Sequence, residues 1–191
     1  MLSTHDQLVQ LLLPETDIER KIISDKEFME GAFWGEPRQG HPEGQVGYHI
    51  REVLDNVEKY GFSENREQLR FLALLHDTFK HKVDITKPKM GENHHGMIAR
   101  RFAEKYIKDK VVLKLLELHD EAYNAWQKGS RDGNWEVAKA RAEKLLVKLR
   151  DNAQLYLIFY RCDNETGSKS QENYLWFEKF VNERKQNILG I

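Results

Sequence analysis

The sequence contains little cysteine and no long apolar run. Its only cysteine is Cys162, so no disulfide can form within the chain, and we expect a reducing compartment, the cytoplasm. The apolar run at residues 8–13 is interrupted by Gln10 and followed by Pro14, which makes it too short and too polar for a membrane span or an export signal. We therefore expect no membrane contact.

A marked excess of charge of either sign is also lacking. The formal net charge is −1 over 191 residues, so the chain has no overall basic field for nonspecific binding to nucleic acid, and any contact with a polyanion must be local. Hydrophobic residues make up 40% and charged residues 32%, which is the balance of an ordinary globular protein. At this length we expect one domain over residues 1–191.

Proline is scarce as well, with four residues in the chain. Apolar residues recur at helical spacing without the period-two alternation of half-buried strands, so we predict an all-α fold. The predicted helices span residues 3–13, 15–30, 45–60, 66–80, 92–108, 110–127, 134–161 (with a break allowed near Asp151) and 171–188. Two irregular stretches, residues 31–44 and 81–93, are long enough to line a site.

Several titratable residues continue the apolar stripes of predicted helices. His49, for example, follows Val46 by three positions and precedes Val53 by four, which places it on the inward face. The five residues of this kind are His49, His76, His95, His119 and Asp163. One such histidine is usually a satisfied core residue. Five of them, buried without partners, would each cost about a few kcal/mol, so we expect them to satisfy one another or a divalent metal.

The dipeptide His-Asp occurs at residues 5–6, 76–77 and 119–120. At 76–77, two adjacent side chains can bracket a metal that lies at the edge of a helix. The pair at 5–6 is better explained by a helix start, where an acid lies near the positive end of the dipole. For Asp120, the sequence favours a solvated helix position over a metal ligand.

The order His49, His76-Asp77, Asp163 resembles the H…HD…D signature of the HD-domain metal-dependent phosphohydrolases, over about residues 38–166. Residues 74–80, LLHDTFK, are similar to the hydrophobic-H-D-x-x-K segment of that superfamily, and residues 161–163, RCD, to its R-x-D ending. Residues 41–49, HPEGQVGYH, resemble the opening of the HD domains of bacterial CCA-adding enzymes and of some nucleic-acid end-processing phosphatases.

The resemblance implies a single HD-type helical bundle with a metal site at its centre, preceded by N-terminal helices at residues 1–30 and followed by a C-terminal helix at 167–191. It also implies one or two divalent ions, Mn²⁺, Fe²⁺, Co²⁺ or Ni²⁺, with Mg²⁺ also compatible. The ligands of the first ion would be His49, His76, Asp77 and Asp163.

Relatives with two metals have further histidines between the HD pair and the last aspartate. By this resemblance, Asp77 would bridge to a second ion held by His95 and His119. His94 competes with His95 for this role, and helical phase favours His95.

The implied reaction is hydrolysis of a phosphomonoester or phosphodiester by a metal-bound hydroxide. Asp77 would act as the bridging catalytic ligand, and Lys80 would neutralise charge on the phosphoryl oxygens, although a solvated lysine at a helix end is the alternative. Arg38, His41 and Arg161 are further candidates for substrate binding, together with Lys80. For Arg38 and His41, ordinary loop exposure explains the sequence equally well.

We expect a small phosphorylated substrate, a nucleotide or a nucleic-acid end. Phe33 and Trp34 on one flank, and the lysines at residues 80–89 on the other, would bracket the metals, since bases stack on aromatic rings and phosphates bind lysine. Ordinary packing of the two aromatic residues fits equally well. Two other functions stay open: a di-iron oxygenase, because the same six ligands suit iron, and a non-catalytic nucleotide-sensing module.

Overall fold

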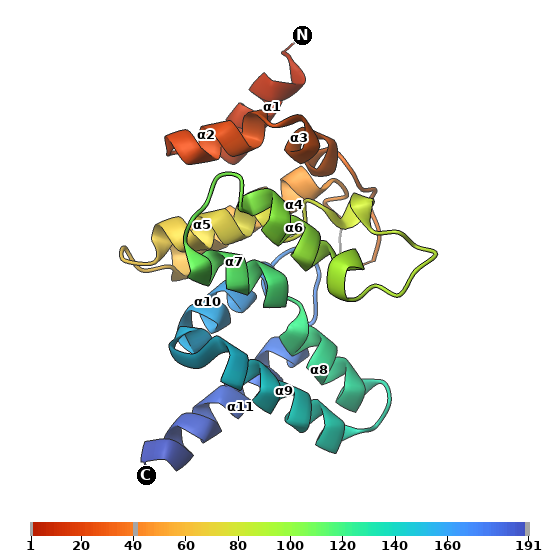
Figure 1. Cartoon of the computed structure of the whole chain (residues 1–191), viewed down its shortest axis with the longest axis vertical. Helices are drawn as coiled ribbons and strands as arrows, with labels where there is room; N and C mark the ends of the chain where they lie inside the picture. Colours follow the sequence, from red (N-terminus) through yellow and green to blue (C-terminus); the bar gives the residue numbers. More distant parts are fainter. Residues whose placement is uncertain (1, 40–41, 190–191) are drawn as a thin grey trace.

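The structure is a computed structural model that describes residues 2–39 and 42–189. This part of the chain is all-α and contains no β-strand (Figure 1). Its α-helices are α1 (Thr4–Leu12), α2 (Asp17–Ser24), α3 (Lys26–Ala32), α4 (Val46–Tyr60), α5 (Arg66–Leu75), α6 (His95–Ala103), α7 (Lys110–Leu118), α8 (Glu121–Ser130), α9 (Trp135–Leu149), α10 (Ala153–Asn164) and α11 (Glu172–Leu189). Short 3-10 helices are η1 (Lys80–Lys82), η2 (Gly91–Asn93) and η3 (Arg150–Asn152).

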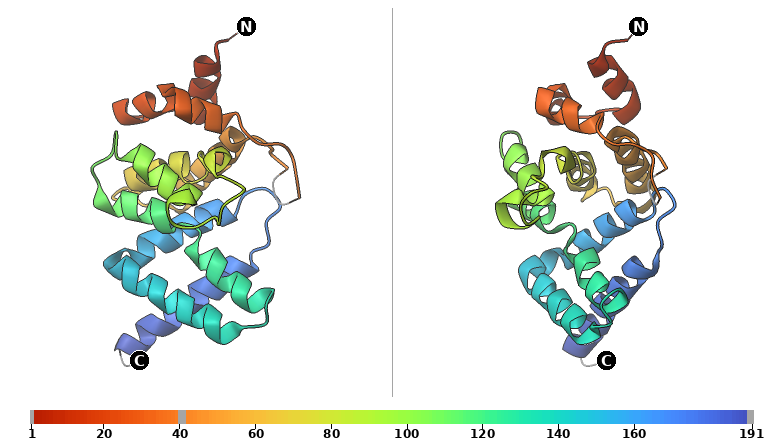
Figure 2. Two further views of the ribbon diagram at one scale, coloured as in Figure 1. Left: turned by 45° about the vertical axis from the view of Figure 1, so that its right-hand side comes forward. Right: turned by 90° about the vertical axis from the view of Figure 1, so that its right-hand side faces the viewer.

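The helices form three tiers along the long axis of the molecule (Figures 1 and 2). Helices α1, α2 and α3 form the N-terminal tier, and α4 to α7 form the middle tier together with α10, which packs against α4 and α5. The hairpin of α8 and α9 forms the C-terminal tier with α11. The candidate site lies where the middle and C-terminal tiers meet, because α7 ends and α8 begins there.

Capping residues explain two of the helix starts. Ser3 and Asp6 form a reciprocal capping box at the start of α1, so the His-Asp pair at residues 5–6 belongs to a helix N-terminus as expected. The predicted helix 15–30 is two helices, because Asp25 caps α3 through the backbone N–H of Glu27 and also accepts a hydrogen bond from Tyr106. A side chain that binds backbone in this way interrupts a helix that apolar spacing alone would continue.

Other predicted boundaries also change. The helix expected at 66–80 ends at Leu75, and the helix expected at 110–127 divides into α7 and α8. The helix expected at 134–161 is interrupted by η3, close to the break allowed near Asp151. The division at α7 and α8 is held by the buried phenol of Tyr156, which lies 2.8 Å from the carbonyl oxygen of His119 and accepts from the backbone N–H of Ala122.

The core consists of aliphatic and aromatic side chains from every tier. On α4 the buried face includes Ile50, Val53 and Leu54, and on α5 every residue from Leu69 to the end of the helix is buried. Burial of such faces is the main stabilising contribution to a helical bundle. No helix in residues 2–39 and 42–189 combines the length and the apolar character that a membrane crossing requires.

Candidate metal centre

The predicted metal ligands converge at the ends of helices in the middle of the molecule. His76 and His119 directly follow α5 and α7, and His95 is the first residue of α6. The remaining members of this group are His49 on α4, Asp77 in the turn after α5 and Asp163 in the last turn of α10. Because α5 ends before the His-Asp pair, His76 and Asp77 lie in a turn and both point toward the centre.

One half of the centre contains His49, His76 and Asp163. The Nε2 atom of His49 lies 3.1 Å from Nε2 of His76 and 3.1 Å from Oδ1 of Asp163. Nε2 of His76 lies 3.6 Å from Oδ1 of Asp163 and also 3.6 Å from Oδ2 of Asp77. The donor atoms of the predicted first metal site therefore face one small volume.

The other half contains His95 and His119. Their Nε2 atoms are 3.0 Å apart, and Oδ1 of Asp77 lies 3.5 Å from the first and 3.6 Å from the second. Asp77 thus presents Oδ2 to one pair of histidines and Oδ1 to the other. This is the arrangement that a carboxylate bridging two cations requires.

Backbone carbonyls fix the tautomers of two of these histidines. Nδ1 of His76 lies 3.2 Å from the carbonyl oxygen of Leu72 and 3.1 Å from that of Ala73, and Nδ1 of His119 lies 2.8 Å from that of Leu116. A carbonyl only accepts, so each Nδ1 carries a proton and each Nε2 is directed into the centre. Imidazole Nε2 atoms directed in this way, beside carboxylates, fit a divalent transition metal.

Asp120 belongs to this cluster, which corrects its interpretation as a solvated helix residue. Its Oδ2 lies 3.2 Å from Nε2 of His95, and its Oδ1 lies 3.5 Å from Nε2 of His119. Oδ2 also lies 3.7 Å from Nε2 of His94. The repeated His-Asp dipeptide is the sequence signal that marked this position. Asp120 supplies the second half with a carboxylate, as Asp163 does in the first.

The two adjacent histidines at the start of α6 have different surroundings. His94 is the N-cap residue of the helix, and its Nδ1 accepts from the backbone N–H of Gly96 at 3.1 Å. His95 is the more buried of the two side chains. Of the two, His95 contacts both Asp77 and Asp120, whereas the ion-pair contact of His94 is with Asp120.

Two lysines keep the central carboxylates charged. Lys80 donates to Oδ2 of Asp77 at 2.5 Å, and Lys169, which the sequence interpretation missed, donates to Oδ1 of Asp163 at 2.8 Å. Burial raises the pKa of Asp77, but Lys80 and His76 outweigh burial and hold this pKa well below its usual range. Burial and Lys169 act in the same opposed way on Asp163, whose pKa is also held well below its usual range. Both carboxylates are therefore ionised near neutral pH.

His49 and His119, one from each half, differ in charge. Burial lowers the pKa of His49 to about 4, so this ring is neutral near pH 7. Burial also disfavours the charged form of His119, but the carboxylates of Asp120 and Asp77 outweigh it and raise the pKa of His119 to about 9. Near neutral pH, His119 is therefore positively charged: its ring carries a second proton in addition to the one on Nδ1.

Close backbone approaches at two glycines hold the turns in place. A Cβ atom on Gly31 would lie 1.9 Å from the carbonyl oxygen of Thr78, so only glycine lets α3 pack against the turn that carries Asp77. A Cβ atom on Gly96 would lie 2.6 Å from the carbonyl oxygen of Leu116, where α6 meets the end of α7. Larger residues at either position would displace ligand-bearing segments.

A cavity of about 550 Å³ opens over the centre. Asp77, Asp120 and Asp163 lie at its base, and Lys80 and Lys169 also line it. One wall is formed by Tyr123 and Trp126 of α8, whose rings stack with centroids 5.9 Å apart and planes at 29°. The remaining lining residues are polar: Gln39, Asn164, Ser168, Ser170 and Asn173, with the phenol of Tyr160. The cavity thus combines ionised carboxylates, two ammonium groups and an aromatic surface.

The predicted substrate-binding residues are distributed differently. Lys80 lines the cavity, but Arg161 does not: its guanidinium stacks 4.0 Å from the ring centroid of Tyr60 and pairs with Glu165 at 2.8 Å. Side chains two residues apart on a helix point about 200° apart around the helix axis. Because Asp163 points toward the centre, Arg161 points away from it. Arg38 is exposed and is not among the lining residues. His41 lies outside the described residues.

The structure also differs from the expectation that aromatic residues on one flank and lysines on the other would enclose the metals. Of residues 31–39 and 42–44, only Gln39 lines the cavity, so Phe33 and Trp34 are not its aromatic wall. The lysines of residues 80–89 do not act as one patch. Lys82 pairs with Glu27, Lys87 pairs with the neighbouring Asp84, and of this group only Lys80 reaches the cavity. Ordinary packing, the alternative for Phe33 and Trp34, agrees with these positions.

In a comparison with protein families, the family model of the HD domain matches residues 46–155. The matched region begins with α4 and ends within α10. It contains His49, His76, Asp77, His95 and His119, and ends eight positions before Asp163. No curated protein and no solved structure matches the chain.

Proposed function

Because the chain belongs to the HD-domain family, whose members are generally metal-dependent hydrolases, we propose that it is a phosphohydrolase that acts on a nucleotide or a nucleic-acid end. The observation that carries the proposal is the position of Asp77, whose two oxygens face two separate pairs of histidine Nε2 atoms. A lone structural carboxylate needs no such symmetric surroundings, whereas a two-ion centre does.

The proposed ligands of the first ion are His49, His76, Asp77 and Asp163. Those of the second are Asp77, His95 and His119, and the contacts of Asp120 with His95 and His119 support it as a further ligand. Divalent ions bound there would supply Lewis acidity and activate a water molecule for attack on phosphorus.

The chain's own residues would bind and orient the phosphate. Lys80 reaches both Asp77 and the cavity, so its ammonium group is placed to neutralise charge on the phosphoryl oxygens during attack. Lys169 holds Asp163 through the side chain and also through the backbone carbonyl oxygen, at 3.0 Å. It therefore orients a proposed ligand and adds positive charge at the base of the cavity.

The aromatic wall supports a nucleotide as substrate. Tyr123 and Trp126 present a stacked pair of rings beside the phosphate-binding groups, and any base can stack on such a surface.

Two measurements test the proposal together. Purified protein is analysed for bound metals by elemental analysis, and protein reconstituted with Mn²⁺, Fe²⁺, Co²⁺ or Ni²⁺ is assayed against phosphomonoesters, cyclic phosphodiesters and nucleotides. We expect metal binding and release of phosphate from a nucleotide or nucleic-acid end. Folded, metal-loaded protein that hydrolyses none of these substrates would contradict the proposal, and oxygen uptake by the iron form would favour an oxygenase.

A further inference from the structure

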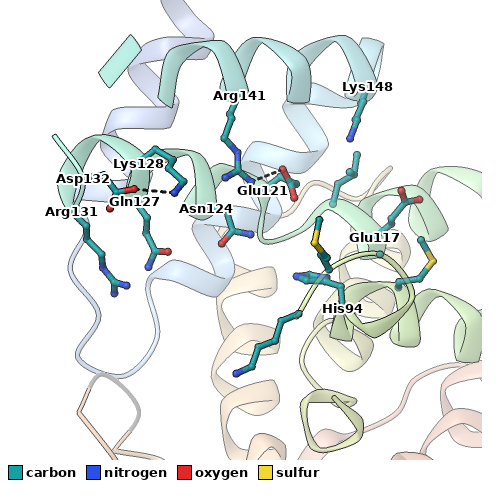
Figure 3. A pocket seen from close by; sticks show the side chains of 15 residues that line it. His94, Glu117, Glu121, Asn124, Gln127, Lys128, Arg131, Asp132, Arg141 and Lys148 are labelled. Carbon is teal, nitrogen blue, oxygen red and sulfur yellow. Dashed lines mark hydrogen bonds and ion pairs between the residues drawn. The ribbon is translucent and has the colours of Figure 1, made fainter. Parts of the chain in front are cut away.

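A second cavity, of about 610 Å³, lies next to the candidate metal centre. It is formed by α8, α9 and the segment that carries Met90 and His94 (Figure 3). His94 lines this cavity and Asp120 lines the cavity over the centre, and these two side chains are 3.7 Å apart. The two cavities therefore adjoin across the contact of His94 with Asp120.

The walls of the second cavity are rich in positive charge. Its basic residues are Lys89, Lys128, Arg131, Arg141 and Lys148, and its acidic residues are Glu117, Glu121 and Asp132. Arg141 and Lys148 point into it from α9 (Figure 3). A local excess of cations in a chain of net charge −1 marks a place where an anion would be attracted.

The acidic residues of the cavity already have cationic partners. Asp132 pairs with Lys128 at 2.9 Å, and Glu121 pairs with Arg141 at 3.5 Å. Glu117 pairs with Arg100, which lies outside the cavity lining. Within residues 2–39 and 42–189, no carboxylate is in ion-pair distance of the other three basic residues, Lys89, Arg131 and Lys148. Positive charge is therefore left over for a ligand.

We propose that this second cavity binds an additional phosphate group of the substrate, beyond the one that reacts at the metal centre. Helix α8 connects the two cavities, since Asp120, Tyr123 and Trp126 face one while Glu121, Asn124 and Lys128 face the other. A chain of phosphates that starts at the centre and passes His94 would enter a cavity whose lining carries the unpaired cations Lys148 and Arg131. Binding of the anion needs only the cavity, whereas its assignment to the substrate rests on the proposed phosphohydrolase function.

The first experiment measures anion binding without catalysis. Inorganic tripolyphosphate is titrated by calorimetry into metal-free protein, so that ions at the centre cannot contribute. The test variant carries Arg131→Glu and Lys148→Glu. The control carries Lys139→Glu and Lys144→Glu, which changes the net charge equally at exposed positions of α9 outside the cavity lining. Circular dichroism checks that both variants keep the helical fold.

We expect wild-type protein and the control to bind tripolyphosphate, and the test variant to bind it weaker by on the order of tenfold or more, since carboxylates replace two cationic contacts. No binding by the wild type would overturn the proposal. Equal weakening in both variants would overturn it too, because the effect would then follow net charge and not the cavity.

The second experiment identifies the source of the phosphate. The KM values of the metal-loaded protein are compared for a nucleoside triphosphate, for a dinucleotide that ends in a phosphate, and for p-nitrophenyl phosphate, which has a single phosphate. For either the nucleoside triphosphate or the dinucleotide, we expect the KM of the test variant, divided by its KM for p-nitrophenyl phosphate, to rise by on the order of tenfold. The control should keep the wild-type ratio.

The outcomes separate the two proposals. Specific tripolyphosphate binding in a protein that hydrolyses no phosphate ester would leave the anion cavity in place and contradict the proposed function. Hydrolysis with unchanged KM ratios would leave the function in place and overturn the second phosphate site.

Discussion

The two halves of the candidate metal centre have the same construction but different electrostatics. Each has a His-Asp pair in the turn after a helix, and in each the histidine Nδ1 faces a backbone carbonyl oxygen of that helix. In the first half, His49 is buried and neutral near pH 7, with a pKa lowered to about 4. In the second half, His119 holds a proton near pH 7, because Asp120 and Asp77 raise its pKa to about 9.

The carboxylate of the second half is also more exposed to solvent than that of the first half. The side chain of Asp163 is 19% exposed, whereas that of its counterpart Asp120 is 30% exposed. His94, which is 19% exposed, opens the second half toward the cationic cavity. The first half is thus prepared to receive a cation near neutral pH, while the second must first release a proton. We expect the first ion to be bound more tightly than the second.

The largest effect is expected when the residue common to both halves is removed. Asp77→Ala should lower metal content at both sites and reduce turnover by about a thousandfold or more, since several kcal/mol of charge stabilisation in the transition state are lost. Elemental analysis and a phosphatase assay measure the two effects. Asp55→Ala, which removes an exposed carboxylate paired with Arg51, is the control. Turnover retained by a folded Asp77→Ala protein would refute the proposed centre.

The next substitution distinguishes the two halves of the candidate metal centre. His119→Ala should reduce the metal content from about two ions to about one, because the first site keeps its full set of ligands. Titration calorimetry and elemental analysis give the stoichiometry. His5→Ala is a suitable control, since His5 is half-buried in the N-terminal tier, where its Nε2 contacts the hydroxyl of Ser24. An unchanged stoichiometry would return His119 to the role of an ordinary core histidine.

The convergence of these ligands was accessible to sequence analysis because helical spacing fixes which face a residue occupies. His49 and His95 each share a stripe with apolar residues, and in the structure both are buried. The same rule placed helices across residues 15–30 and 110–127, where the structure has breaks. An apolar stripe continues across such a break, and only distant partners such as Tyr156 and Tyr106 show where the chain turns.

Other parts of the site depend on tertiary geometry that the spacing of residues along the sequence does not determine. Asp120 follows an inward-facing histidine, and it reaches the centre because α7 ends before that histidine. Lys169 lies on the segment between α10 and α11. Its contact with Asp163 therefore depends on the path that this segment takes past the end of α10. Arg161 lies in the motif that resembles R-x-D, but the helix turns it away toward Tyr60.

The difference in protonation gives a pH-dependent prediction. Below a pH of about 9, a cation at the second half must displace the proton of His119, so affinity for the second ion should rise with pH, by up to about tenfold per unit. His49 is already neutral at pH 6 to 8, as its pKa of about 4 lies below this range. Affinity for the first ion should therefore change much less there.

Calorimetry in buffers of different ionisation enthalpy counts the protons released. At pH 7.5 we expect about one proton to be released when the second ion binds and close to none from His49 when the first ion binds. In His119→Ala, the proton release should disappear together with the second binding event. Equal proton release at both steps would mean that the two halves do not differ in the way their electrostatics indicate.

The smallest effect concerns the side from which a base approaches the centre. The sequence left a stacking role for Trp34 and its ordinary packing equally open, whereas the structure places Trp126 and Tyr123 in the cavity wall. A base stacked on an aromatic residue contributes about 1–3 kcal/mol. Trp126→Ala should therefore raise KM for a nucleotide by about fivefold or more, and raise KM less for p-nitrophenyl phosphate, whose single ring offers a smaller stacking surface.

Trp34→Ala is the matched control for this change, because it removes an indole that is 42% exposed and does not line the cavity. We expect it to alter neither KM value, since no contact of Trp34 with the cavity is available to be lost. Steady-state kinetics of both variants on both substrates decide between the two surfaces. An effect of Trp34→Ala on the nucleotide alone would mean that residues 31–39 close over the substrate and that the wall of α8 only packs against its neighbours.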